Sequence, residues 1–562
     1  MRYPDDGIYM KPDAGRILVG CFERQAKPID PDALPQDFAF GELPFDLDHF
    51  LPYYQAATER VPAIEPIGVR TWFNGPESFT PDGRYMLGES PEVSGLFVAA
   101  GFNSIGIQSS GGVGQVMAQW LMDKRPPMDL WEVDVRRFQP FQNNADYLVP
   151  RTAESLGLLY AMHWPYLQHE SARGVRTSPM YEATRAKGAC FGELAGWERP
   201  NWYAQSGSTP SYDYTYKRPK WFDRCANECQ AVRTSAALFD QTSFAKYEIQ
   251  GPDAQNFLDY LCTANMNVAP GKVVYCQWLN EKGGIEADVT VTRINEELYW
   301  VVSAAASSVR DLNWMARHRA GFEISIIDIT ERYAVIGVMG PRARHTLQPL
   351  TNSDLSHEAF PFATSQEIEL AGIAVRAARI TYVGALGWEL YIPWQATVKV
   401  YQLLEHLTHA GYHAMDSLRM EKGYRHWGHD ITDEDSPLQA GLSFTVDWAK
   451  SEQTLGLAAL AEQKTVGVDR RLALFAITNP EVLLTHDEPI WREGQRVGHV
   501  VSSAYSHTFR QSLAFGYIHG ELGLTRKSVL AGDYTIEVGV NQHQACVSIT
   551  ALYDPKNLEI HN

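Results

Sequence analysis

Hydrophobic and polar residues alternate most regularly between Gly271 and Val291. Residues 272–280 are rich in β-branched and aromatic side chains, which favour a strand. The turn that follows, residues 281–284, ends in two glycines that can take positive φ angles. Residues 285–291 then alternate Ile, Ala and Val with Glu, Asp and Thr, which predicts a second strand with one apolar and one polar face.

Asp288 lies in the middle of that polar face. Aspartate is unfavourable inside a strand, so its presence there calls for an explanation. The pattern alone leaves two explanations open: Asp288 is a solvated carboxylate on an exposed strand face, or it is a carboxylate with a role in catalysis.

The first quarter of the chain also predicts short elements. Residues 6–23 predict two strands joined by a Pro-Asp-Ala-Gly turn, and residues 50–61 predict a helix. A strand at 96–100 leads into a glycine-rich turn at 101–106. Gly111-Gly112-Val113-Gly114 then leads into a helix, whose apolar residues recur at a spacing of three to four. That stripe consists of Val113, Val116, Met117, Trp120 and Leu121.

The rest of the chain predicts further strands and helices. The predicted helices are residues 221–232 and 398–409, and the predicted strands are 299–302, 333–338, 472–477, 497–503 and 512–517. The last three strands predict a small all-β region at the C-terminal end.

Composition places the chain among globular proteins. Its 562 residues exceed one ordinary hydrophobic core, which predicts roughly two to four domains. The net charge of −18, without a long basic run, argues against a nucleic-acid surface. No apolar run approaches the ~20 residues of a membrane helix. The N-terminus lacks the pattern of a signal peptide.

Neither the cysteines nor the histidines predict a metal site. Cys225 and Cys229 lie four residues apart without a matching second pair, so we interpret them as two thiols on one helix. His426 and His429 are three residues apart, but no third ligand accompanies them.

Four segments in the last two-thirds of the chain resemble, in order, the glycine-cleavage T-protein (aminomethyltransferase) family. The first runs from Tyr275 through Asn-Glu-Lys-Gly-Gly-Ile to Asp288. The other three are 381–390 (TYVGALGWEL), 416–424 (DSLRMEKGY) and 426–437 (HWGHDITDEDSP).

This resemblance implies a tetrahydrofolate site. It implies that Glu389 accepts the paired hydrogens of the pterin edge, as carboxylates do in bidentate contacts. It makes Asp288 the catalytic carboxylate near the N5 and N10 nitrogens, where it orients the nucleophile and stabilises a cationic iminium. Tyr275 and Tyr382 are candidates for packing on the pterin or its aminobenzoyl ring, with a place in the protein core as the alternative.

Two positions depart from the T-protein pattern. Ala385 stands where the motif carries Glu, and Met415 stands where glycine-cleavage T-proteins have Arg. These departures favour the dehydrogenase relatives over glycine cleavage itself.

A second resemblance covers the N-terminal part. Residues 76–83 (PESFTPDG), 100–107 and the Gly-Gly-x-Gly that follows are similar to the C-terminal end of the flavin domain in D-amino-acid-oxidase-like proteins, above all the sarcosine and dimethylglycine dehydrogenases. It implies that FAD contacts a cofactor-binding turn made of Gly101, Phe102, Asn103, Ser104, Ile105 and Gly106. A helix dipole and free N–H groups there stabilise negative charge on a reduced flavin. No G-x-G-x-x-G fingerprint occurs in this sequence, so we expect the FAD site in it to be incomplete.

The predicted fold is therefore α+β and multidomain. We expect part of a flavin domain at 1–138, a connecting segment at 139–199, a T-protein-like folate-binding domain at 200–460 and a C-terminal β-barrel at 461–562.

The implied reaction is oxidative N-demethylation of a small amine such as dimethylglycine or sarcosine, with the one-carbon unit passing to tetrahydrofolate as 5,10-methylenetetrahydrofolate. The implied partners are the amine, folate, and an electron acceptor or a separate flavin-domain fragment, with no nucleic acid and no membrane. The expected location is the cytoplasm, or the mitochondrial matrix in a eukaryote. Two alternatives stay open: a free-standing folate-dependent methyl or aminomethyl transferase, and a folate-binding protein without catalysis.

Overall fold

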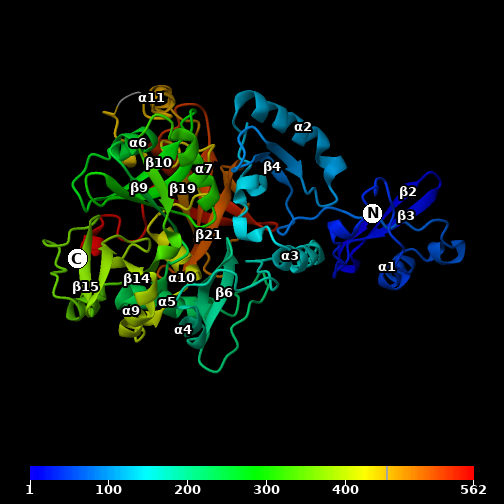
Figure 1. The fold of residues 1–562 in the computed structure, drawn as a ribbon, viewed down its shortest axis with the longest axis horizontal. Helices are drawn as coiled ribbons and strands as arrows, with labels where there is room; N and C mark the ends of the chain where they lie inside the picture. The colour runs from blue at the N-terminus through cyan, green and yellow to red at the C-terminus, as the bar shows by residue number, and fades with distance from the viewer. Residues whose placement is uncertain (451–452, 562) are drawn as a thin grey trace. The chain divides into compact units, whose positions relative to one another are not determined.

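The computed structural model describes residues 1–450 and 453–561. The chain divides into two compact units, Met1–Arg173 and Gly174–Asn562, and each has its own core (Figure 1).

The first unit confirms the predicted hairpin and helix near the N-terminus. Its strands are β1 (Arg2–Tyr3), β2 (Ile8–Asp13), β3 (Arg16–Cys21), β4 (Met86–Glu89) and β5 (Phe97–Ala100). Its helices are α1 (Leu47–Arg60), α2 (Gly106–Asp123) and α3 (Ala145–Gly157). Strands β1–β3 form one antiparallel sheet, and β4 pairs with β5.

Helix α2 begins earlier than the sequence predicts. It starts at Gly106, so Gly111, Gly112 and Gly114 lie inside the helix and do not precede it. Glycine costs a helix only about 1 kcal/mol, which the packing of the rest of the helix offsets. The predicted apolar stripe is narrower than expected, because Trp120 is buried but Leu121 is 53% exposed.

The second unit contains two antiparallel sheets that carry the predicted T-protein-like region. One sheet has the order β10 (Val273–Leu279), β11 (Ile285–Arg293), β12 (Leu298–Ser303), β9 (Ala245–Gln250), β13 (Ser325–Asp328). The other has the order β15 (Ser365–Leu370), β16 (Ile373–Ala378), β17 (Gly387–Pro393), β14 (Tyr333–Met339), β8 (Ala237–Asp240), β18 (Thr408–His409), of which only the β8–β18 pairing is parallel. A separate hairpin pairs β6 (Ala189–Leu194) with β7 (Trp197–Tyr203).

Helices pack against both sheets. Those of the second unit are α4 (Tyr181–Ala186), α5 (Phe222–Thr234), α6 (Ala254–Leu261), α7 (Ser308–His318), α8 (Ala343–Leu347), α9 (Thr397–Leu404), α10 (Tyr412–Glu421), α11 (Leu457–Val466), α12 (Arg526–Leu530) and α13 (Leu558–His561). The core of the first sheet includes Phe257 of α6 and Met315 of α7, and the core of the second includes Leu347 of α8 and Val400 of α9. Cys225 and Cys229 lie on α5 as buried free thiols, as predicted.

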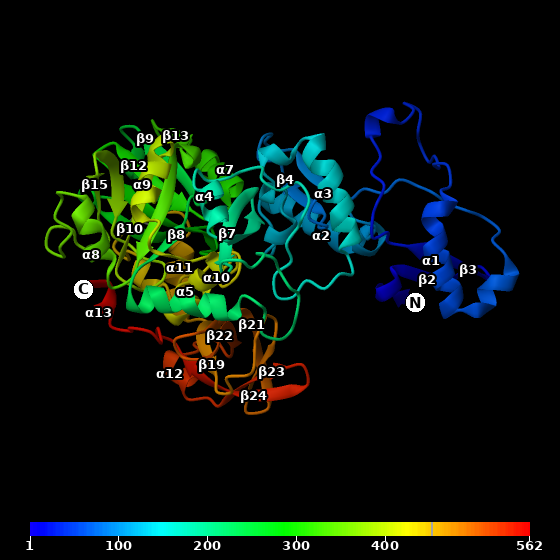
Figure 2. The ribbon, with the colours of Figure 1, turned by 90° about the horizontal axis from the view of Figure 1, so that it is seen from below.

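The C-terminal region is a closed barrel, which confirms the predicted all-β end. Its strands follow the order β19 (Arg470–Ile477), β22 (Gln511–His519), β21 (Gln495–Ser506), β20 (Pro489–Arg492), β23 (Tyr534–Val538), β24 (Asn541–Ser548). Helices α5 and α10 lie between the barrel and the two sheets (Figure 2).

The hairpin of β10 and β11 has the predicted strands and turn, but the polar face of β11 is only partly solvated, with Asp288 and Thr290 half-buried. Glu286 is buried and forms an ion pair with Arg310 of α7. Gln277 of β10 is opposite Asp288 of β11 in the register. Tertiary packing therefore covers part of a face that alternation alone predicts to be polar and exposed.

The predicted helix at 398–409 is too long. Helix α9 ends at Leu404, and Thr408–His409 instead forms β18 beside β8. The unpaired edge of β8 captures these two residues, because pairing satisfies backbone groups that a continued helix would leave exposed at the sheet edge.

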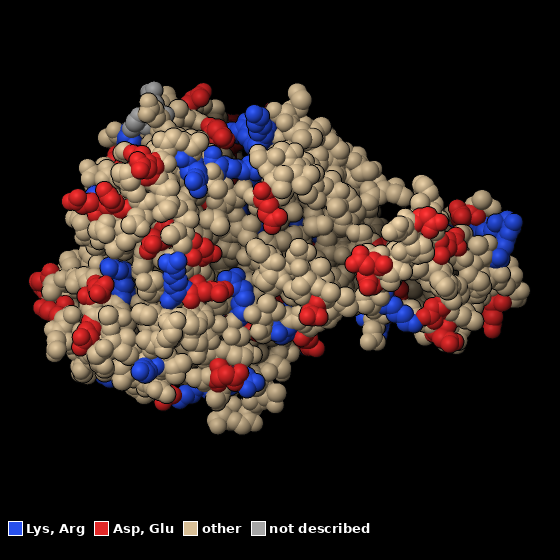
Figure 3. All heavy atoms as spheres, in the orientation of Figure 1, with Lys and Arg blue, Asp and Glu red and all other residues tan. Residues whose placement is uncertain are grey.

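No described helix is long and apolar enough to cross a membrane. On the face that Figure 3 shows, basic side chains are scattered among acidic ones and do not gather in one patch.

Candidate functional site

Asp288 is held by a glutamine on the neighbouring strand. The Nε2 of Gln277 donates to Oδ1 of Asp288 at 2.8 Å. Thr445 donates to Oε1 of the same amide at 2.5 Å, which fixes its orientation. Gln277 is fully buried, so Gln277 and Thr445 together hold the Asp288 carboxylate in a fixed position.

The surroundings of Asp288 favour its neutral form more than water does. Burial raises the pKa of Asp288 to about 6, against the hydrogen bonds from Gln277 and Tyr275 and the positive charge of Arg425. Arg425 stays near because its guanidinium donates to the carbonyl of Ala440 at 2.8 and 3.0 Å. Asp288 is thus a carboxylate that exchanges protons near neutral pH, as a general base does.

The two candidate tyrosines lie near Asp288. Tyr275 is 36% exposed and interacts with the neighbouring Asp288 carboxylate. Tyr382 donates its hydroxyl to the carbonyl of Arg425 at 2.7 Å and stacks on Tyr424 with ring centroids 6.0 Å apart. The structure therefore brings Asp288, Tyr275 and Tyr382 together around Arg425.

Glu389 lies on β17, in the other sheet, and both of its oxygens accept hydrogen bonds. Tyr391 donates to Oε2 at 2.9 Å, and the Nε2 of Gln241 donates to Oε1 at 3.2 Å. Burial raises the pKa of Glu389, while these bonds and the charge of Lys246 oppose that rise. The carboxylate keeps lone pairs for further donors, because each oxygen can accept more than one hydrogen bond.

A glycine makes room for the glutamine that contacts Glu389. Gly337 on β14 is opposite Glu389 in the register, and a Cβ there would lie 2.2 Å from Oε1 of Gln241. That oxygen is buried and has no hydrogen-bond donor among the described residues. An unpaired acceptor beside a carboxylate suits a ligand edge that carries several N–H donors, such as a pterin.

Lys246 is a buried residue that lies close to Gln241 and Glu389. Its Nζ donates to the carbonyls of Thr242 at 2.9 Å and Phe244 at 2.8 Å, so it holds the segment that follows Gln241. Burial lowers the pKa of Lys246 to about 7, with Asp328 as the strongest opposing charge.

The two departures from the T-protein pattern lie in one apolar cluster. Ala385 and Met415 are 2% and 3% exposed and pack in the same core as Phe239 and Leu418. Where the T-protein pattern has Glu and Arg, this chain thus has two apolar side chains that fill the core.

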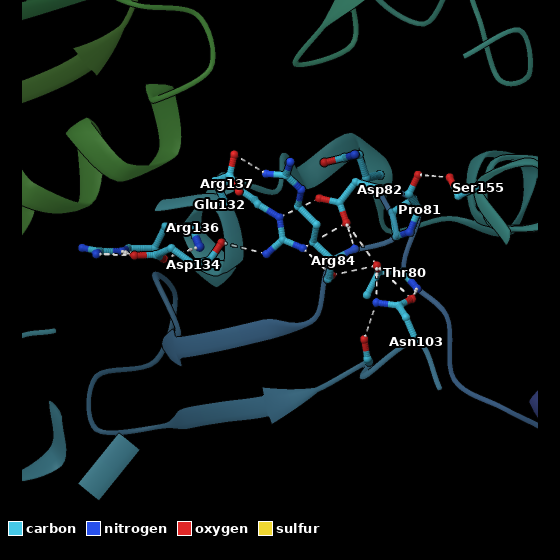
Figure 4. A network of polar contacts seen from close by, with 12 residues as sticks. Thr80, Pro81, Asp82, Arg84, Asn103, Glu132, Asp134, Arg136, Arg137 and Ser155 are labelled. Atoms are coloured by element: carbon cyan, nitrogen blue, oxygen red, sulfur yellow. Dashed lines mark hydrogen bonds and ion pairs between the residues drawn. The ribbon is translucent and has the colours of Figure 1, made fainter. Parts of the chain in front are cut away.

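The glycine-rich turn of the first unit is fastened by Asn103. Its Oδ1 accepts from the backbone of Thr80 at 2.8 Å, and its Nδ2 donates to the carbonyl of Gly101 at 2.8 Å (Figure 4). Figure 4 also shows Arg137 holding the neighbouring segment through Asp82, at 2.6 Å. The side chain of Asn103 is thus occupied by contacts that shape the turn.

The rest of that turn presents backbone groups. Asn103 and Ser104 have positive φ angles of 49° and 65°, and Ile105 precedes α2 without a side-chain cap. Phe102 stacks on Tyr85 with ring centroids 5.2 Å apart. The first N–H groups of α2, from Gly106, lack intrahelical partners and form a donor set that fits an anionic flavin edge.

His426 and His429 contact each other, with ring centroids 4.5 Å apart. In the described ranges, no group of three or more His, Cys, Asp or Glu side chains is arranged to hold a metal ion.

The sequence did not single out the side chains that contact the predicted site residues. These are Gln241, Lys246, Gln277, Tyr391 and Arg425. The sequence could have indicated two of them, because residues two apart on a strand lie on the same face. Gln277 follows Tyr275 by two residues, and Tyr391 follows Glu389 by two residues. Arg425 and Gln241 lie in loops, whose side-chain directions a sequence pattern does not give.

Comparisons with family models match nearly the whole chain. Residues 1–120 match the FAD dependent oxidoreductase model, and 124–178 match its central domain. Residues 180–450 match the GCVT N-terminal domain, and 470–554 match the glycine cleavage T-protein C-terminal barrel domain. These matches confirm the predicted fold class and imply FAD and tetrahydrofolate as cofactors.

Two curated relatives match along almost all of the chain. A 4-methylaminobutanoate oxidase (formaldehyde-forming) from Paenarthrobacter nicotinovorans is 40% identical over 98% of this chain and 67% of its own length. A mitochondrial sarcosine dehydrogenase from Mus musculus is 35% identical over 100% of this chain and 66% of its own length. The chain thus spans about two thirds of the length of these relatives.

A solved structure shares the fold of the second unit. The aminomethyltransferase T of the glycine cleavage system from Bartonella henselae superposes with a TM-score of 0.58 at 23% identity, covering 68% of this chain and 99% of that one.

Proposed function

Because this chain belongs to the sarcosine and dimethylglycine dehydrogenase family, we propose that it takes part in the oxidative N-demethylation of a small methylated amine, with transfer of the one-carbon unit to tetrahydrofolate. The observation that carries the folate half is the setting of Asp288. It is a carboxylate with a pKa near 6, fixed by Gln277 and placed beside two tyrosines. Such a group suits proton transfer at neutral pH.

The two cofactors supply the reactive centres. FAD supplies a hydride acceptor for the N-methyl group, and tetrahydrofolate supplies a nucleophilic nitrogen for the one-carbon unit. In the first unit, the N–H groups at the start of α2 would hold the flavin edge, and Asn103 would keep the turn in shape.

We assign Asp288 the catalytic role in transfer. Its carboxylate would orient the attacking nitrogen, stabilise the cationic carbon and accept the proton that leaves the nitrogen. Gln277 would hold the acceptor oxygen in place, and Arg425 would keep the carboxylate ionised.

We assign Glu389 and Gln241 to the pterin edge. The carboxylate and the unpaired Oε1 of Gln241 would accept neighbouring pterin hydrogens. Tyr391 would hold Glu389 in one rotamer through its hydroxyl.

Tyr275 and Tyr382 would pack on the folate rings. Tyr275 has the more accessible ring, at 36% exposure. The hydroxyl of Tyr382 already donates within the protein, so its ring, and not its hydroxyl, would contact the ligand.

The relative from Paenarthrobacter favours a second candidate function. Its name describes an oxidase that forms formaldehyde. In that case the oxidised N-methyl group would be hydrolysed by water to formaldehyde, whether or not tetrahydrofolate is present. The amine would be an N-methylated amino acid in both cases. The reduced flavin would be re-oxidised by an electron acceptor outside this chain. We propose the cytoplasm, or the mitochondrial matrix in a eukaryote, as the location.

Product analysis tests these functions. The protein would be incubated with FAD, an electron-accepting dye and sarcosine, dimethylglycine or 4-methylaminobutanoate, with and without tetrahydrofolate. Dye reduction with 5,10-methylenetetrahydrofolate as product supports the first function, and dye reduction with formaldehyde in both conditions supports the second. Folate binding without any turnover would contradict both and leave a non-catalytic folate-binding protein.

A further inference from the structure

Lys246 is a buried lysine whose hydrogen bonds go to neutral groups. It lies on β9 and is 1% exposed. Within the described ranges its Nζ forms no ion pair, and it donates to the carbonyls of Thr242 at 2.9 Å and Phe244 at 2.8 Å. Lysine is rarely buried unless it is paired, because an ammonium loses more on leaving water than neutral acceptors return. A methionine would fill the same space without that cost, so the charge indicates a role beyond packing.

The two hydrogen bonds of Lys246 restrain the link between the two sheets of the second unit. Strand β8 ends at Asp240 and strand β9 begins at Ala245, and the two strands belong to different sheets. Residues 241–244 join them, and the side chain of Lys246 turns back to bind this link. Gln241, the first residue of the link, donates to Oε1 of Glu389 at 3.2 Å. Lys246 therefore holds the segment that carries Gln241 to Glu389.

The charge of Lys246 acts on three carboxylates, of which Glu389 is the one at the proposed pterin edge. Asp328 raises the pKa of Lys246 most, but it is exposed at the end of β13, where water screens its charge. Asp240 is buried, and its two oxygens already accept a side-chain and a backbone hydrogen. Arg176 is a positive charge that opposes these carboxylates at Lys246. Glu389 is half-buried on β17 and keeps room for a ligand.

The other titratable groups around Glu389 are phenols. Tyr391 of the same strand donates to Oε2 at 2.9 Å, and Tyr412 of α10 lies close enough for the Glu389 carboxylate to raise its pKa. Burial raises the pKa of both phenols, so they stay neutral between pH 5 and 8. The positive charge that opposes the effect of burial on the pKa of Glu389 comes from Lys246.

We propose that Lys246 is a positioning residue for the pterin edge of folate, which holds the link that carries Gln241 and keeps Glu389 ionised for the ligand. The inference rests on the proposed function, in which Glu389 accepts paired pterin hydrogens. An ionised carboxylate accepts on both oxygens, whereas a protonated one turns one oxygen into a donor and loses the bidentate contact.

The effect of the charge appears in acid solution. Burial lowers the pKa of Lys246 to about 7, so the side chain is mostly protonated at the acid pH values where Glu389 takes up its proton. Folate affinity should fall as Glu389 is protonated. Without the charge of Lys246, Glu389 is protonated at a higher pH, so the loss of affinity should begin at a higher pH.

Two variants separate the charge from the hydrogen bonds. Lys246→Gln removes the charge and keeps two N–H donors, whereas Lys246→Met removes both. Tetrahydrofolate is titrated by calorimetry against the full chain from pH 5 to 8 under argon. The parent chain for this titration carries Asp288→Asn, so that the proton of Asp288 does not contribute to the profile.

Both variants should move the midpoint of the affinity loss to a pH higher by about 0.5–1. At pH 8, Lys246→Met should bind about three- to tenfold more weakly than the parent, because the link is no longer held, and Lys246→Gln should lose less. In a parent that also carries Glu389→Gln, this midpoint should be absent, and Lys246→Gln should have no effect on the profile.

Lys450→Gln is the matched control. The Nζ of Lys450 also donates to two carbonyls, those of Cys262 at 2.7 Å and Ala264 at 2.9 Å, and it is ion-paired with Asp259 at 3.2 Å. Lys450 is not among the groups that shift the pKa of Glu389. Its substitution should leave the midpoint where the parent has it.

The outcomes separate this inference from the proposed function. A parent and a wild type that do not bind tetrahydrofolate contradict the proposed function. Binding with the parent midpoint in both Lys246 variants overturns the inference alone, and an equal loss of affinity at every pH does so too, because it leaves Lys246 a structural role. Loss of folding in both variants, measured by thermal unfolding, also overturns it, since it assigns Lys246 to the fold.

Discussion

Gln277 and Asp288 are opposite each other on β10 and β11, and the amide of one donates to the carboxylate of the other at 2.8 Å. The bond fixes one carboxylate oxygen, and the carboxylate keeps lone pairs for a ligand beside the hydrogen bond from Tyr275. The hairpin thus presents a single carboxylate in a defined rotamer, which is the arrangement that proton transfer requires.

Asp288→Asn should reduce one-carbon transfer to tetrahydrofolate by about 10²-fold or more, because it keeps the shape and removes the charge and the proton acceptor. Folate affinity should change little. Single-turnover transfer and a folate titration on the same preparations measure the two effects. Equal transfer rates in variant and wild type would return Asp288 to a purely structural role.

The transfer rate should rise with pH through about 6. Burial raises the pKa of Asp288 to about 6, so the carboxylate that accepts a proton is lost in more acid solution. The measurement is the transfer rate between pH 5 and 8 at saturating folate. Asp288→Asn should show no inflection near pH 6, and an inflection that survives in this variant contradicts the assignment.

The same residue should lower stability at neutral pH. A carboxyl whose pKa is higher in the folded than in the unfolded state stabilises the fold below pH ~4, and this contribution is lost as pH rises through about 6. Asp288→Asn should therefore raise the free energy of unfolding at pH 8 by about 1–3 kcal/mol and have less effect at pH 4. Urea unfolding at both pH values measures this, with Glu281→Gln on the exposed turn as the control.

Glu389→Gln should weaken tetrahydrofolate binding by roughly 2–4 kcal/mol, because it replaces an acceptor oxygen with a donor and removes the charge from a bidentate contact. Fluorescence quenching or calorimetry measures the affinity. Glu367→Gln, an exposed carboxylate on β15, is the control. Wild-type affinity in Glu389→Gln would place the pterin elsewhere.

Gly337→Ala should weaken folate binding without unfolding the protein. Its Cβ would lie 2.2 Å from Oε1 of Gln241, and that flexible side chain would move off Glu389. We expect a loss of about three- to tenfold in affinity, in line with the loss of one hydrogen bond between neutral groups. Gly114→Ala is the control, because a Cβ there meets no atom within 4 Å. Equal affinities in the two variants would exclude Gln241 from the site.

Much of the fold follows from the sequence. Alternation identified β10 and β11 and the turn between them, and similar local patterns identified the N-terminal hairpin, α1 and three barrel strands. These elements are specified by residues close in sequence, through side-chain periodicity and glycine-rich turns. Motif order identified both cofactor regions, and the family models agree with it.

Tertiary structure decided the contacts that give the candidate residues their properties. The polar face of β11 is covered at Glu286, because Arg310 of α7 pairs with it, a contact that the strand pattern does not contain. Residues 408–409 pair with β8 and do not extend α9, because an open sheet edge competes with the helix for the same backbone groups.

The candidate site also combines features that the sequence determined with features that only the tertiary structure decided. The sequence determined which carboxylates were candidates, Asp288 and Glu389, because their strands and motifs are local. It did not determine that Gln277 would fix Asp288 or that Gln241 would reach Glu389 from 148 residues away. A pKa, a hydrogen-bond partner or an unpaired donor depends on everything that packs around a side chain, and only the folded chain brings those groups together.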